Sequence, residues 1–110
     1  MNEQGFNFNR NETIARIRTA LRKRSGKAWS VTGGRGTAYG WITISAPPAR
    51  RVQPFDYLSE ADGAELAQLL GKDRIHCQGE SIPDSHDYYR EYVDRAEGRA
   101  PAVYGRPYWD

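Results

Sequence analysis

Two stretches of alternating apolar and polar residues flank a glycine-rich segment, and this arrangement limits which folds the chain can adopt. Residues 28–32 and residues 39–45 both alternate with a period of two, which is typical of strands that bury one face. Between them, residues 33–38 contain three glycines. Glycine reaches the positive φ angles that hairpin connections need. The pattern therefore predicts a β-hairpin.

The alternation also predicts which side chains share a face of this hairpin. If Thr32 lies opposite Tyr39, paired residues across the two strands point to the same side. The core face then carries Trp29, Val31, Ile42 and Ile44. Tyr39 and Trp41 lie on the opposite face, among Ser and Thr.

A helix is predicted before the hairpin. Ile14, Ile17 and Leu21 recur at helical spacing. Asn11 is suited to the N-cap, and Ser25-Gly26 to the end of the helix, where basic residues favour the helix dipole.

A second helix and a short strand are predicted after the hairpin. Ser59 and Asp62 match a capping box, and Leu66 lies on the apolar face of a helix that ends at Gly71. Residues 74–78 are predicted to form the strand.

A third helix begins at Asp84 or Ser85 and stops at Gly98. Its acidic side is predicted to be a solvated face, because arginines are interleaved with the acids: Asp84, Asp87, Glu91 and Asp94. Residues 99–110 hold two tyrosines and a tryptophan, and we expect this aromatic tail to pack back over the domain.

These elements predict an α+β fold in the order α-β-β-α-(β)-α, with the hairpin packed against helices. The 110 residues suit one domain. We expect residues 1–10 to be a flexible N-terminal segment and residues 11–110 to form the single domain.

The sequence favours a cytoplasmic location. No apolar run approaches the ~18 residues needed to cross a bilayer, so no membrane contact is expected. The N-terminus lacks the regions of a signal peptide, and the lone Cys77 has no partner for an intrachain disulfide.

Charge divides the chain into two unlike halves. Residues 1–51 carry ten Lys or Arg against two acids, and residues 52–110 carry six against twelve. Such asymmetry is typical of a protein with an electrostatic partner. It also fits two halves that fold together and neutralise each other.

The first helix and the hairpin form a candidate nucleic-acid or polyanion site. Basic side chains bind phosphates there, glycine amides of the hairpin offer an anion-binding nest, and an exposed tryptophan offers a stacking surface. The candidate residues are Arg16, Arg18, Arg22, Lys23, Arg24, Gly34, Arg35, Gly36 and Trp41. Lys27, Arg50 and Arg51 would extend the basic surface.

Enzyme chemistry finds little support in the sequence, and no cofactor, metal or catalytic residue is expected. His76 and Cys77 are adjacent, so on a strand they would point to opposite faces. His86 paired with Cys77 is the remaining arrangement for a Cys/His-dependent enzyme.

Residues 14–18 and 30–42, which read Ile-Ala-Arg-Ile-Arg and Ser-Val-Thr-Gly-Gly-Arg-Gly-Thr-Ala-Tyr-Gly-Trp-Ile, resemble a group of uncharacterised bacterial and mobile-element proteins. The segment is also similar to a small α-β-β module of the large polyvalent protein-associated class. Residues 81–83, 92–99 and 107–110 resemble the first group too. Neither group has functional residues to carry over, so the resemblance implies only a mobile-element or phage-related setting.

These observations predict a small non-catalytic binding module that contacts nucleic acid or another polyanion. The first alternative is a protein-interaction or self-associating module, in which the basic half docks onto the acidic half of a partner or a second copy. The second is the Cys/His-dependent enzyme.

Overall fold

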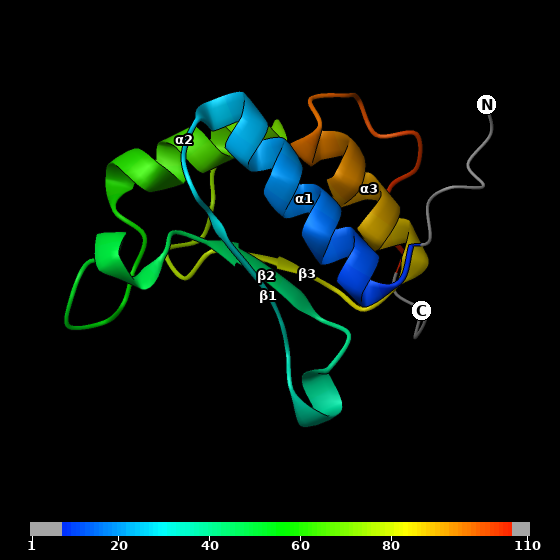
Figure 1. Ribbon diagram of the computed structural model, residues 1–110, viewed down its shortest axis with the longest axis horizontal. Coiled ribbons are helices and arrows are strands. Elements are labelled where there is room, and N and C mark those ends of the chain that lie inside the picture. Colours follow the sequence, from blue (N-terminus) through cyan, green and yellow to red (C-terminus); the bar gives the residue numbers. More distant parts are fainter. Residues whose placement is uncertain (1–7, 107–110) are drawn as a thin grey trace.

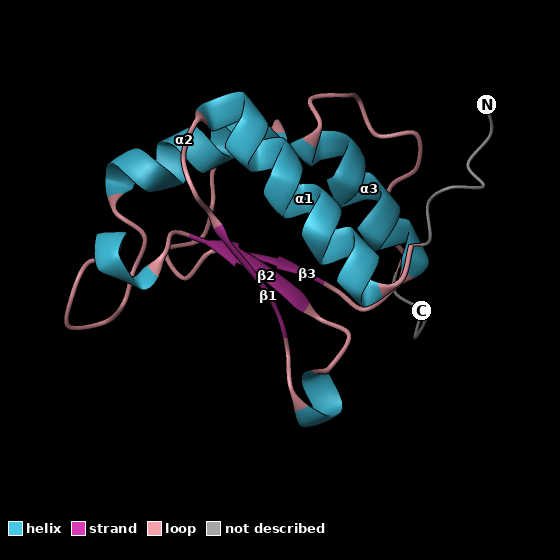
Figure 2. Cartoon of the chain, viewed as in Figure 1, coloured by secondary structure: helices cyan, strands magenta, loops and turns pink. Residues whose placement is uncertain are grey.

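A three-stranded antiparallel sheet carries two helices side by side on one face, with a third helix at one end (Figures 1 and 2). The computed structural model describes residues 8–106. The helices are α1 (Arg10–Ser25), α2 (Glu60–Leu70) and α3 (His86–Ala96), and the strands are β1 (Ser30–Gly33), β2 (Ile42–Ser45) and β3 (Glu80–Ile82). Two short 3₁₀ helices are η2 (Gly36–Ala38) and η3 (Pro48–Arg50). The α+β class and the order of the elements are as predicted.

Helix α1 begins earlier than the sequence indicated. Asn9, and not Asn11, is the N-cap, and its side chain accepts a hydrogen bond from the Glu12 amide at 2.8 Å. Either asparagine has the right chemistry, but Phe8 packs against the core and fixes where the chain enters the helix. The helix therefore includes Arg10, so the boundary expected after residue 10 falls inside an element. Residues 1–7 of the expected flexible segment lie outside the described residues.

The hairpin has the predicted faces but a different register. Thr32 lies opposite Thr43, and Val31 lies opposite Ile44, whereas the prediction placed Thr32 opposite Tyr39. The strands are shifted by four residues, and an even shift keeps every side chain on its face. Val31, Ile42 and Ile44 are accordingly fully buried. The strands pair later than predicted because residues 34–41 form a longer connection that contains η2.

The predicted strand at residues 74–78 is wrong. The third strand is β3, and its Ile82 pairs with Ile42 of β2. Residues 72–79 are a loop, closed where the Gly79 amide donates to the His76 carbonyl at 2.8 Å. Gly79 has φ +103°, and a Cβ there would lie 2.4 Å from the Ile44 carbonyl oxygen, so the loop needs glycine to reach the sheet.

The two later helices begin where the sequence placed them. The Ser59 side chain accepts from the Asp62 amide at 3.1 Å and the Ser85 side chain from the Tyr88 amide at 3.1 Å. Gly71 ends α2 in the left-handed region, with φ +68°.

The acidic side of α3 is solvated at Asp87 but not at Glu91 and Asp94, which corrects the sequence interpretation for these two residues. Glu91 and Asp94 are only 6% and 9% exposed. Glu91 accepts a hydrogen bond from the Gly105 amide at 2.7 Å, and Asp94 accepts one from the Ala102 amide at 2.9 Å. The described part of the C-terminal tail therefore packs back onto α3, and these carboxylates hold it. Residues 107–110 lie outside the described residues.

The core fills the space between the sheet and the helices. Helix α1 contacts β1 and α3, and α3 contacts β3 and α2. The largest fully buried side chains are Ile17, Leu21, Val31, Ile42, Ile44, Leu66, Leu70 and Ile82. This packing leaves the outer side of α1 and the connection of residues 34–41, which we call the arm, at the surface. The arm projects from the body below the sheet in Figure 1.

Candidate nucleic-acid interface

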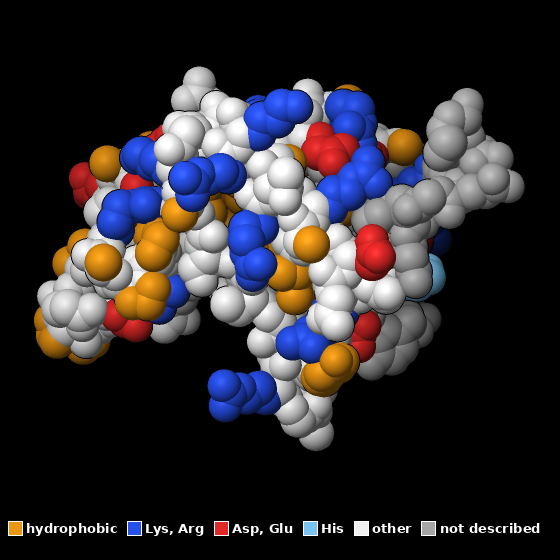
Figure 3. All heavy atoms as spheres, viewed as in Figure 1, with side chains coloured by type: hydrophobic (Ala, Val, Ile, Leu, Met, Phe, Trp, Pro, Cys, Tyr) orange, Lys and Arg blue, Asp and Glu red, His pale blue; other side chains and the backbone are white. Residues whose placement is uncertain are grey.

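Lys and Arg side chains gather over α1 on one face of the molecule, and another lies out on the projecting arm (Figure 3). Arg35 is the basic residue of the arm and is exposed. On α1, Arg18, Arg22, Lys23 and Arg24 are exposed and Arg16 is half-buried. The predicted basic residues thus share one side, but their contacts divide them into two groups.

Arg16 and Arg24 are engaged by the protein itself. Arg16 Nε donates to Glu97 Oε2 at 2.6 Å, in an ion pair between α1 and the end of α3. Arg24 Nη1 donates to the carbonyl oxygens of Leu69 at 2.8 Å and Ala96 at 2.7 Å. Those carbonyls lie at the C-terminal ends of α2 and α3, where a cation is favoured by the helix dipole. Both arginines therefore join helices.

Arg18, Arg22 and Lys23 form the outward group. Arg18 Nη2 donates to the Val31 carbonyl at 2.7 Å. This bond ties α1 to β1 but leaves the positive charge without an acid partner among residues 8–106. Within residues 8–106, Arg22 and Lys23 form no hydrogen bond or ion pair through their side chains. The three surround a hollow of about 410 Å³, whose other lining residues are Thr19, Ala28 and Trp29.

The basic surface does not extend to the other predicted residues. Lys27 Nζ pairs with Glu65 at 2.7 Å. Arg50 Nε pairs with Asp62 at 3.1 Å, and Arg51 Nη1 pairs with Asp56 at 3.3 Å. The acids of the second half neutralise these cations, as expected of two halves that fold together. Among residues 8–106, four of the predicted basic residues neither pair with an acid nor join two helices: Arg18, Arg22, Lys23 and Arg35.

Glycines of the arm have a structural role. The Gly34 amide donates to the Trp41 carbonyl at 2.8 Å and closes the arm. A Cβ on Gly34 would lie 2.0 Å from the Ala38 carbonyl oxygen, and Gly36 has φ +57°. These positions therefore need glycine to present Arg35 at the surface. Trp41 is 37% exposed at the base of the arm.

A polar cluster that the sequence did not reveal holds the base of the arm. The Tyr89 hydroxyl of α3 donates to the Gly40 carbonyl and lies 3.5 Å from Asp84 Oδ1. Burial first, and then the charge of Asp84, raise the pKa of Tyr89 to about 12, so this hydroxyl keeps its proton. The Arg10 guanidinium lies 3.9 Å from the centre of the Tyr39 ring. The cluster joins segments far apart in the sequence, and no local spacing would have indicated it.

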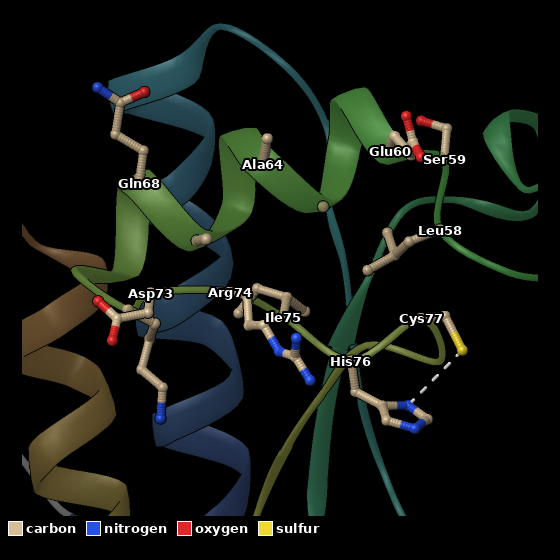
Figure 4. A pocket seen from close by; sticks show the side chains of 13 residues that line it. Leu58, Ser59, Glu60, Ala64, Gln68, Asp73, Arg74, Ile75, His76 and Cys77 are labelled. Carbon is tan, nitrogen blue, oxygen red and sulfur yellow. Dashed lines mark hydrogen bonds between the residues drawn. The ribbon is translucent and has the colours of Figure 1, made fainter.

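An open groove of about 910 Å³ runs between α2 and the loop that precedes β3 (Figure 4). His76 and Cys77 lie at one end, and Cys77 Sγ is 3.9 Å from His76 Nδ1. The expectation that they point to opposite faces is wrong, because they lie in a turn and not on a strand. His76 Nδ1 also accepts from the Gln78 amide at 3.1 Å. That bond occupies the lone pair a general base would use to accept the thiol proton.

Two further kinds of feature, a metal-binding cluster and a membrane-spanning helix, are absent from the described residues. Between residues 8 and 106, no group of three or more His, Cys, Asp or Glu side chains is placed to hold a metal ion. In the same range, no helix combines the length and apolar character that a membrane span requires.

No family model matches the chain, and no match was found among curated proteins or among solved structures.

Proposed function

We propose that this protein is a small binding module that contacts nucleic acid or another polyanion through the outer side of α1 and the arm. The observation that carries the proposal is the separation of the basic residues into two groups. Lys27, Arg50 and Arg51 are paired with acids. Arg22 and Lys23 stay exposed and without acid partners among residues 8–106.

Like charges left together cost stability through mutual repulsion, which a bound polyanion relieves. Phosphate contacts made by such residues release counterions, so the affinity falls as salt rises. The hydrogen bond from Arg18 to Val31 fixes the outward row against the sheet, which lowers the ordering cost of binding.

Fluorescence anisotropy of labelled DNA and RNA oligonucleotides, titrated with the protein at several salt concentrations, tests the proposal. The variant Arg22→Glu/Lys23→Glu should bind at least about tenfold more weakly and show a shallower salt dependence. Arg74→Glu is the matched control, since Arg74 is exposed in the groove beyond α2. No binding by the wild type at about 50 mM salt, where phosphate contacts are strongest, would contradict the proposal.

A protein-interaction or self-associating module is the second candidate, and a different observation favours it. Phe55 and Val52 are 69% and 48% exposed on a loop closed by two hydrogen bonds between the backbones of Val52 and Tyr57. Apolar side chains that form a contiguous exposed patch are typical of interaction sites. The complementary-halves version is less favoured, because many of the acids already pair within the chain.

Sedimentation equilibrium over a range of protein concentrations tests this candidate. Self-association should raise the mass with concentration and be lost in Phe55→Ser. A mass that stays at the monomer value at every concentration would exclude self-association. The candidate would then require a partner other than a second copy of the chain.

The mobile-element or phage-related setting implied by the sequence resemblance stays a prediction. Neither candidate function depends on it.

A further inference from the structure

Arg22, Arg18 and Arg35 follow a line, with Lys23 beside Arg22 in the sequence. Arg18 and Arg22 are one helical turn apart on α1, and Arg18 is fixed to the Val31 carbonyl of β1. Strand β1 is at the edge of the described sheet, and the chain continues along that edge to Arg35. The row from Arg22 to Arg35 is thus about 20 Å long.

A single row suits one nucleic-acid backbone better than two. A duplex presents two backbones across grooves about 6 to 12 Å wide, and a protein that straddles a groove needs a second row. On the described surface, the side chains that would supply it are engaged: Arg16 is paired with Glu97 and Lys27 with Glu65.

The hollow beside the row is largely apolar. Ala28 and Trp29 line it between the cations Arg18, Arg22 and Lys23. Its volume of about 410 Å³ lies within the range of about 300–1,000 Å³ usual for small-molecule sites. A base or sugar can enter such a hollow while its phosphate stays at the basic rim, but a base stacked inside a duplex cannot.

Tyr39 of the arm offers a stacking surface. Its side chain is 57% exposed, while the Arg10 guanidinium supports the ring at 3.9 Å. Arg10 is itself held close to β1, where a Cβ on Gly33 would lie 2.0 Å from Arg10 Nε. The ring is therefore fixed in place and open to solvent, as a platform for an unpaired base must be.

We infer that the nucleic acid bound by this surface is single-stranded, with its backbone along the row from Arg22 to Arg35 and an unpaired base stacked on Tyr39. This inference rests on the proposed function, and it adds the strand form of the ligand and a residue that reads it.

The test compares a labelled oligothymidine or oligouridine with a hairpin duplex of equal phosphate number. The single strand should bind at least about tenfold more tightly at the same salt. Tyr39→Ala should weaken single-strand binding between about 5-fold and about 150-fold without changing the salt slope. Tyr39→Phe keeps the ring and should bind like the wild type. Arg22→Gln/Lys23→Gln should instead reduce the salt slope.

Circular dichroism confirms that each variant is folded before its affinity is compared. Duplex binding equal to or tighter than single-strand binding overturns the inference and leaves the proposed function standing. Full affinity in a folded Tyr39→Ala variant overturns it as well. If neither oligonucleotide form binds, the inference and the proposed function fail together.

Discussion

Three consecutive cations, Arg22, Lys23 and Arg24, lie in the last turn of α1. Their contacts differ, and so do their roles. Arg22 and Lys23 point outward without partners among residues 8–106. Arg24 donates to carbonyls at the ends of α2 and α3. Composition and spacing alone treat all three as members of one basic patch. Only the packing of two later helices against the end of α1 sets Arg24 apart.

Arg24→Ala should therefore destabilise the protein by about 2 kcal/mol, because it leaves carbonyls of two helix ends without their shared donor. Arg22→Ala, the matched control, should change the free energy of unfolding by less than about 0.5 kcal/mol. Urea denaturation followed by circular dichroism measures both. Equal stabilities of the two variants would show that Arg24 does not join the helices.

At the scale of elements, the arm depends on glycine for its shape. In Gly34→Ala, the new Cβ would lie 2.0 Å from the Ala38 carbonyl oxygen, so backbone must move. We expect a loss of about 1–3 kcal/mol and weaker oligonucleotide binding, since Arg35 and Tyr39 lie on the arm. Gly63→Ala is the control. A Cβ added at Gly63 would have nothing within 4 Å, and alanine in α2 should stabilise the helix by up to about 1 kcal/mol.

If the arm has this shape, thermal unfolding should show a lower melting temperature than the wild type for Gly34→Ala and a higher one for Gly63→Ala. A Gly34→Ala protein with wild-type melting temperature and affinity would mean that the backbone at residues 34–38 adapts without cost.

Local signals predicted the elements well where one segment decides its own structure. The capping box at Ser59, the end of α1 at Gly26 and the faces of Val31 and Ile44 all follow from short-range rules. The hairpin register does not follow from short-range rules, because the length of the arm is set by contacts with Arg10 and Tyr89 from distant elements.

The position of the third strand was predicted wrongly for a related reason. Residues 74–78 have the composition of a strand, but pairing with β2 is decided by which residue fills the space beside Ile42. Ile82 does so, and Gly79 provides the close approach of the loop to the sheet. Only part of the candidate site could be predicted from the sequence, for the same reason. Residue types located the basic side of α1, but only tertiary packing showed which cations remain unpaired and that Tyr39 is supported by Arg10.

For the whole molecule, ion pairs between the two halves of the chain explain much of the charge asymmetry. Glu97 at the end of α3 accepts from Arg16 of α1 and from Arg99 of the tail. Burial acts to raise the pKa of Glu97, but the hydrogen bonds from Arg16 and Arg99 outweigh it and hold the pKa below its usual range. One carboxylate thus links the first helix, the last helix and the tail.

This lowered pKa predicts how stability responds to acid. A carboxylate with a depressed pKa in the folded state stabilises the fold above its unfolded pKa, and that contribution is lost as the pH falls through the folded value. Glu97→Gln should cost about 0.5–1 kcal/mol at neutral pH. It should then lose less stability than the wild type between about pH 6 and about pH 3.

Urea denaturation at a series of pH values measures the difference between the two proteins. Asp73→Asn is the control, because Asp73 is exposed and forms no ion pair within residues 8–106, and its curve should run parallel to that of the wild type. The curves of Glu97→Gln and the wild type should converge as the pH falls. Curves that stay parallel would mean that the ion pairs of Glu97 with Arg16 and Arg99 do not stabilise the fold, and that Glu97 does not join the two halves of the chain.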